Sequence, residues 1–124
     1  THIKNANKDI TSILIIEDKE GLEILEEISQ IENLNIIFVG LYDLCQCLGF
    51  DGNLDDPEFL SIFEKTIKKI RTLGISVGSY AHNAISGKRL IDLGVNFLTL
   101  NVDGAMLRIA YENVLNELNG YLPK

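Results

Sequence analysis

The fold is decided by residues 36–45, which read IIFVGLYDLC. Four apolar residues run directly into Gly40, and Asp43 follows three positions later. An apolar run of this length that ends at a turn residue is typical of a strand buried on both faces. Asp43 then follows the carboxyl end of that strand, where parallel α/β folds place their chemistry.

A second strand ends in the same way further upstream. Residues 12–16 read SILII and are followed directly by Glu17. The two strands therefore deliver Glu17 and Asp43 to the same edge of the predicted sheet. On the residues alone, acids at strand ends are more often helix caps or solvated side chains, and Asp43 could instead cap a short turn over residues 44–48.

The rest of the chain alternates strands with helices. We expect strands at 12–16, 35–39, 75–79 and 95–102, and helices at 19–31, 57–73, 83–93 and 104–118. Residues 40–56 form a long connection, residues 1–11 a polar N-terminal tail or connection, and residues 12–124 a single domain. The alternation predicts right-handed crossovers and a parallel sheet, and therefore an α/β fold of four βα units.

The length of the chain limits whether these four units can form a closed barrel. A complete (β/α)8 TIM barrel takes about 250 residues, whereas this chain has 124. We therefore expect half of such a barrel, which needs a second half from another copy, another chain or a longer precursor. The alternative is an open, flavodoxin-like doubly wound sheet that binds a small ligand at its strand ends.

Helix ends are signalled by caps. Asp18, Asp56 and Asp103 are the expected N-caps of three helices, because aspartate side chains accept hydrogen bonds from the first-turn amides. Gly74 and Gly94 follow the last turns of the helices expected at 57–73 and 83–93, where a glycine adopts the left-handed conformation without strain.

Composition excludes some classes of protein. The net charge of −7 and the absence of a basic stripe argue against nucleic-acid binding. No apolar stretch approaches the roughly 20 residues that span a bilayer. The polar N-terminus shows no secretory signal, and two cysteines do not form a disulfide framework, so we expect a reduced, cytoplasmic protein.

We expect neither the two cysteines nor His82 to form a functional site. Cys45 and Cys47 are too few ligands for a closed zinc site. His82 follows the third predicted strand, and a histidine there is more often a loop residue than an acid–base group or metal ligand.

Two segments resemble the HpcH/HpaI aldolases. Residues 14–22, LIIEDKEGL, resemble the strand that delivers that family's metal-binding glutamate, with a second glutamate opening the helix. Residues 38–44, FVGLYDL, resemble its phenylalanine-isoleucine-glycine-proline-alanine-aspartate-leucine segment. Shorter matches follow at Gly49, Gly52-Asn53, Asp56-Pro57-Glu58, Gly78, Ala81 and Val102-Asp103. The resemblance runs from about residue 12 to residue 118 and covers the C-terminal half of the family's barrel.

The resemblance implies a class II pyruvate aldolase. In that family a divalent ion, usually Mg²⁺ or Mn²⁺, holds pyruvate as its enolate. Glu17 and Asp43 would be the metal ligands, and backbone N–H groups between Gly40, Tyr42 and Asp43 would bind the carboxylate of a small 2-oxo acid. Carboxylate oxygens suit hard divalent ions, which act as Lewis acids on a carbonyl.

The chain also departs from the family pattern. Ile15 replaces a glutamine, Leu41 replaces the proline, and Tyr42 replaces a small residue. The family's catalytic histidine and substrate-binding arginine lie in its N-terminal half, and no residue here matches them, so no catalytic residue is assigned.

Two hypotheses follow. The first is a metal-dependent carbon–carbon lyase that acts on 2-oxo or 4-hydroxy-2-oxo acids through a pyruvate enolate, as part of a completed and oligomeric barrel. The second is a non-catalytic half-barrel that serves assembly or ligand binding, which Ile15, Tyr42 and the absent half favour.

Overall fold

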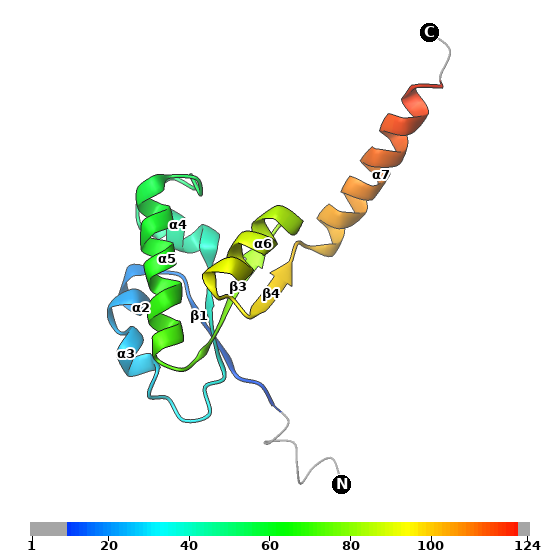
Figure 1. Cartoon of the computed structure of the whole chain (residues 1–124). Coiled ribbons are helices and arrows are strands. Elements are labelled where there is room, and N and C mark those ends of the chain that lie inside the picture. The colour runs from blue at the N-terminus through cyan, green and yellow to red at the C-terminus, as the bar shows by residue number, and fades with distance from the viewer. Residues whose placement is uncertain (1–9, 122–124) are drawn as a thin grey trace, which may run out of the picture.

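Four parallel strands form one sheet in the computed structural model, which describes residues 10–121 (Figure 1). The strands are β1 (Ile13–Ile16), β2 (Ile36–Val39), β3 (Ser76–Ala81) and β4 (Phe97–Leu100). They lie side by side in the order β1-β2-β3-β4, so the predicted parallel sheet of four βα units is confirmed. The doubly wound alternative is wrong, because such a sheet reverses its strand order at a switch point.

Helices connect each strand to the next, and one more helix follows β4. They are α2 (Lys19–Glu23), α3 (Leu25–Ile28), α4 (Leu41–Cys47), α5 (Pro57–Thr72), α6 (Ala84–Leu93) and α7 (Asp103–Asn119). None of them is long and apolar enough to cross a membrane, as judged over residues 10–121.

Register separates the residues of the sheet into two faces. Ile16, Val39 and Ser79 lie opposite one another on neighbouring strands, and each is at most 2% exposed. Because side chains alternate along a strand, the neighbouring row points the other way. That row consists of Ile15, Phe38, Gly78 and Phe97.

The first face is covered by helices and forms the core. From α5, Phe59, Phe63, Ile67 and Ile70 are at most 2% exposed. Their spacing of three and four residues places them on one side of the helix. Burying a side chain of this size contributes about 1.5–3 kcal/mol. The sheet contributes Ile16, Ile37, Val39, Val77 and Ala81 to the same cluster.

The second face of the sheet, called here the open face, is apolar but only partly covered. Ile13 is 42% exposed and Ile15 is 57% exposed. Together with Phe38, Phe97 and Thr99, they line a hollow of about 340 Å³. The rings of Phe38 and Phe97 meet edge to face over Gly78, where an added Cβ would lie 2.7 Å from Phe38 Cδ2.

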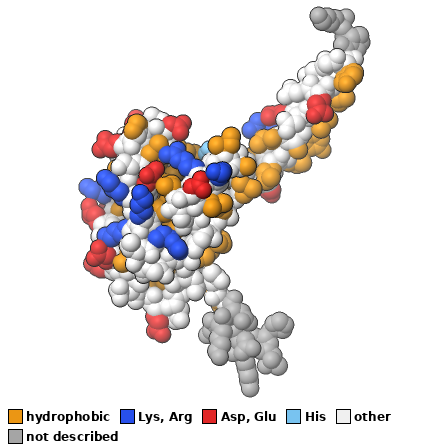
Figure 2. All heavy atoms as spheres, in the orientation of Figure 1, with side chains coloured by type: hydrophobic (Ala, Val, Ile, Leu, Met, Phe, Trp, Pro, Cys, Tyr) orange, Lys and Arg blue, Asp and Glu red, His pale blue; other side chains and the backbone are white. Residues whose placement is uncertain are grey.

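α7 projects away from the sheet and the other helices (Figure 1). None of its residues is buried. Hydrophobic side chains nevertheless lie along its surface (Figure 2). An apolar stripe recurs at helical spacing through Leu107, Tyr111, Val114 and Leu118, all of them more than half exposed.

Most predicted caps are confirmed. Asp18 accepts a hydrogen bond from the Gly21 amide, and Asp56 accepts from two amides of the first turn of α5. Gly74 and Gly94 have φ angles of 80° and 103°, in the left-handed region. Asp103 is not a cap: α7 begins at this residue and Val102 is its N-cap.

Three element predictions need correction. The helix expected over residues 19–31 is two short helices that a turn at Ile24 separates. The long connection over residues 40–56 contains α4, and the fourth strand is shorter than residues 95–102. Residues 1–9 of the predicted N-terminal tail lie outside the described residues.

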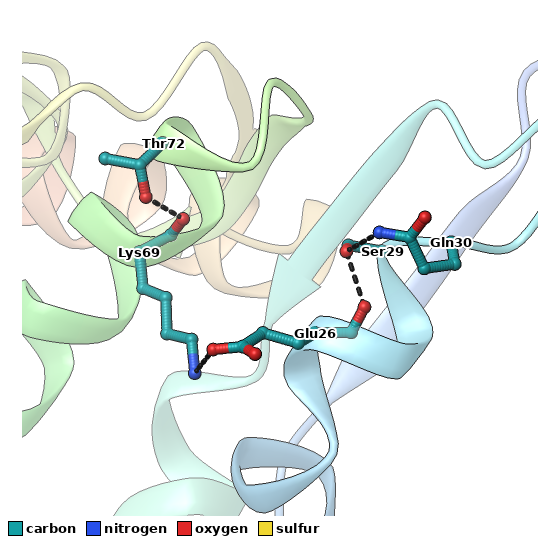
Figure 3. Close-up of polar contacts among 5 residues, drawn as sticks. All are labelled: Glu26, Ser29, Gln30, Lys69 and Thr72. Carbon is teal, nitrogen blue, oxygen red and sulfur yellow. Dashed lines mark hydrogen bonds and ion pairs between the residues drawn. The ribbon is translucent and has the colours of Figure 1, made fainter.

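An ion pair joins the helices α3 and α5. Lys69 Nζ of α5 lies 2.9 Å from Glu26 Oε1 of α3 (Figure 3). The hydrogen bond that Lys69 donates, followed by the positive charge of its ammonium group, holds the pKa of Glu26 below its usual value. Both side chains remain largely exposed, at 42% and 71%, so the pair adds little to stability.

Candidate functional site

The ends of β1 and β2 bring Glu17 and Gly40 together. The Gly40 amide donates to the Ile16 carbonyl at 2.9 Å, which continues the ladder between the two strands. A Cβ added at Gly40 would lie 2.9 Å from Glu17 Cβ and 3.2 Å from Glu17 Oε2. The position therefore requires a glycine for steric reasons, because any side chain would occupy the space beside the Glu17 carboxylate.

Asp43 is placed by α4. Leu44 and Cys45 are fully buried and hold this helix on the core, while Asp43 points to solvent from its first turn. Gly40 is the N-cap of α4, and its carbonyl accepts from the Leu44 amide at 3.0 Å. The alternative in which Asp43 caps a turn over residues 44–48 is wrong, because the helix begins before it.

Both carboxylates are open to solvent at the same edge of the sheet. Within residues 10–121 neither of them forms an ion pair. The same residues contain no group of three or more His, Cys, Asp or Glu side chains that could hold a metal ion. A divalent cation here would take two protein carboxylates and complete its coordination with water and substrate oxygens, which fits a hard ion such as Mg²⁺ or Mn²⁺.

The structure also contains a cluster that the sequence did not reveal, called here the aromatic cluster, formed by Tyr42 of α4, Tyr80 of β3 and His82, which follows β3. The Tyr42 hydroxyl and His82 Nδ1 are 3.0 Å apart and share a hydrogen bond. The rings of Tyr42 and Tyr80 meet edge to face with centroids 5.9 Å apart. Partial burial raises the pKa of Tyr42, and the electrostatic effect of the neighbouring Tyr80 raises it further, which keeps the phenol neutral.

Asn101 ties this cluster to the end of β4. Its side chain accepts from the Tyr80 hydroxyl at 3.3 Å and donates to the His82 carbonyl at 3.1 Å. The backbone N–H of Asn101 donates to the Ala81 carbonyl at 2.8 Å. The aromatic cluster is thus held by residues from the ends of three strands.

The two cysteines do not form a site. Cys45 is buried in the core and Cys47 is exposed. Burial raises the pKa of the Cys45 thiol, which keeps it protonated and inert.

The parallel sheet and the carboxylates that follow its strands define a class of protein. The chain is part of a parallel α/β barrel with carboxylates at the carboxyl ends of its strands. Residues 1–110 match the family model for HpcH/HpaI aldolase/citrate lyase, and the chain belongs to this family. It is 27% identical over 122 residues to a hydroxypyruvate/pyruvate aldolase of Pseudomonas aeruginosa, covering 98% of this chain and 46% of that protein. It is 30% identical over 114 residues to a 2-keto-3-deoxy-L-rhamnonate aldolase of Salmonella paratyphi A, covering 92% and 43% respectively.

A solved structure shows the same fold. An HpcH/HpaI aldolase/citrate lyase family protein from Burkholderia cenocepacia superposes with a TM-score of 0.87 at 23% identity, covering 95% of this chain and 46% of that one. The structural neighbours share the TIM-barrel fold. The predicted half of a (β/α)8 barrel is therefore confirmed, and the chain spans less than half the length of the relatives it matches.

Proposed function

We propose that this chain forms the metal-binding half of an aldolase that makes or breaks a carbon–carbon bond at pyruvate. The observation that carries the proposal is the placement of Glu17 against Gly40, with Asp43 on the helix that follows at once. Curated relatives that carry the name aldolase support the reaction class.

Glu17 and Asp43 would hold the divalent ion. When bound, Mg²⁺ or Mn²⁺ would act as a Lewis acid on the carbonyl of a 2-oxo acid and favour its enolate. Gly40 keeps the space beside Glu17 free, and no side chain caps the first turn of α4, so the amides near Tyr42 and Asp43 are available to the substrate carboxylate. The catalytic acid–base group would come from the half-barrel that completes the site.

The open face supports the need for a second half. Ile13, Ile15 and Phe97 line an apolar hollow on the side of the sheet that a barrel would enclose. Apolar surface of this kind is stabilised by removal from water. The completing half-barrel can belong to a longer polypeptide, another copy or a complementary chain.

The test uses this chain joined to, or co-expressed with, its complementary half. Mn²⁺ affinity is measured by electron paramagnetic resonance, and pyruvate release is measured from oxaloacetate and from 4-hydroxy-2-oxo acids. Glu17→Gln and Asp43→Asn are each expected to weaken Mn²⁺ binding by at least about tenfold, because each removes a charged ligand. Glu20→Gln, the same chemical change on the exposed surface of α2, is the matched control.

The proposal fails if the completed barrel with Mn²⁺ releases no pyruvate, or if the two site variants bind Mn²⁺ like the control. The second candidate, a non-catalytic half-barrel, is favoured by the Tyr42 ring, which takes the place of a small family residue beside the site. Activity that both Glu17→Gln and Asp43→Asn abolish would exclude it.

A further inference from the structure

Tyr80 of the aromatic cluster lies on the same side of the sheet as Gly40 and Glu17. Val39 and Ser79 are paired in the register and both face the helices, where the Ser79 hydroxyl donates to the Val39 carbonyl at 3.0 Å. The next pair, Gly40 and Tyr80, therefore faces the other way. Because Gly40 lies against the Glu17 carboxylate, Tyr80 extends the same row one strand further.

Tyr42 contacts the end of this row from α4. It lies two residues beyond Gly40, and its ring crosses from the start of α4 to the end of β3, where it meets Tyr80 and His82. The three rings lie in mutual contact, with centroid separations of 5.9 to 6.2 Å. A ligand that extends from the two carboxylates towards β3 meets this surface.

Hydrogen bonds make the aromatic cluster rigid and leave it one defined polar group. Tyr42 occupies Nδ1 of His82, and Asn101 holds the Tyr80 hydroxyl and the His82 carbonyl. Among residues 10–121, no side chain or backbone group bonds the other ring nitrogen of His82, Nε2, which is therefore the group available to a ligand. A rigid aromatic wall limits the length of what fits, and a single nitrogen favours a partner with a hydroxyl or oxo group.

We propose that Tyr42, Tyr80 and His82 form the wall that selects the aldehyde part of the substrate, and that they restrict it to short aldehydes with a hydrogen-bonding group. Tyr42 sets the length limit, and His82 binds the polar group. This inference rests on the proposed aldolase function and adds a substrate class to it.

The experiment compares two 4-hydroxy-2-oxo acids in the completed barrel with Mn²⁺. One releases a short hydroxylated aldehyde, and the other releases a longer unbranched aliphatic aldehyde. The measured quantity is the selectivity, defined as the ratio of kcat/KM for the first substrate to that for the second. One methylene in a tight pocket changes such a ratio by about 10-fold or more.

Tyr42→Ala is expected to lower the selectivity by at least about tenfold, because it removes the ring that limits length. Tyr42→Phe keeps the ring and frees His82, so it should change the rate for the hydroxylated substrate and leave the length limit in place. Tyr111→Ala removes an exposed tyrosine of α7 and should leave the selectivity unchanged. A purely structural role of Tyr42 would lower both rates equally and would overturn the inference.

A separate reaction distinguishes the failure of the inference from the failure of the proposed function. Exchange of the methyl hydrogens of pyruvate with deuterated water needs the metal site but no aldehyde. Wild-type protein that exchanges these hydrogens but shows the same selectivity as Tyr42→Ala, or cleaves neither substrate, contradicts the inference alone. Wild-type protein that neither exchanges nor cleaves contradicts both.

Discussion

Gly40 illustrates how a single missing side chain shapes the site. Gly40→Ala is expected to lower the free energy of unfolding by about 1–3 kcal/mol, since overpacking of a close contact costs this much. The new Cβ would lie 2.9 Å from Glu17 Cβ. Urea denaturation followed by circular dichroism measures the change.

Gly104→Ala is the matched control for this prediction. An alanine there meets nothing within 4 Å, and it lies in the first turn of α7. Its helix propensity should therefore leave stability unchanged or raise it by up to about 1 kcal/mol. Equal effects of the two substitutions would show that the space beside Glu17 is not constrained.

At the same scale, the sequence predicted the carboxylates but not the aromatic cluster. Glu17 directly follows β1, and Asp43 lies in the first turn of the helix that follows β2, so the position of each is a local property of the chain. Tyr42 and His82 are 40 positions apart, and their contact depends on the pairing of β2 with β3. No local pattern encodes which rings meet across two strands.

Among the elements, α4 was hidden within an apparent loop. Its apolar residues Leu41, Leu44, Cys45 and Leu48 stand at spacings of three and four, which is a helical pattern. Glycines and aspartates further along the segment suggested a loop throughout. The break between α2 and α3 had no such signal, because Leu22, Leu25 and Ile28 keep one spacing through the turn at Ile24.

The contact between α3 and α5 should depend on pH. Because Lys69 lowers the pKa of Glu26 from its usual value of about 4.5, the pair stabilises the fold above that pH, and this stabilisation is lost as the pH falls through the lower folded-state pKa. The urea midpoints of wild type and Glu26→Gln should differ near neutral pH, converge in acid and converge in high salt. Glu27→Gln, an exposed neighbour on α3, should match wild type under all three conditions.

α7 should be far less protected than α5. Its amides are expected to exchange with deuterated water at least about 100-fold faster, because opening it breaks no buried contact and an isolated helix of this length is marginal. Mass spectrometry of peptic peptides from this chain alone measures both helices in one experiment. Comparable protection of the two helices would mean that the apolar stripe of α7 is covered in solution.

The whole molecule is defined by an apolar face that half a barrel leaves open. Ile15 is 57% exposed on that open face, whereas Ile85 is 83% exposed on α6. In this chain alone, Ile15→Glu should reduce self-association in sedimentation velocity, because it places a charge on the apolar hollow. Ile85→Glu, which lies away from that hollow, should change the association less.

The same two variants should behave differently once the barrel is complete. A barrel encloses the open face, so Ile15→Glu would bury an unpaired carboxylate and lower the free energy of unfolding by several kcal/mol, about 3 or more. Ile85→Glu should remain within about 0.5 kcal/mol of wild type, as surface substitutions usually do. Ile15→Glu should therefore reduce self-association of the half-barrel but lower the stability of the completed barrel. If Ile15→Glu is tolerated in both forms, the second half does not cover this face, and the site would have to be completed in another way.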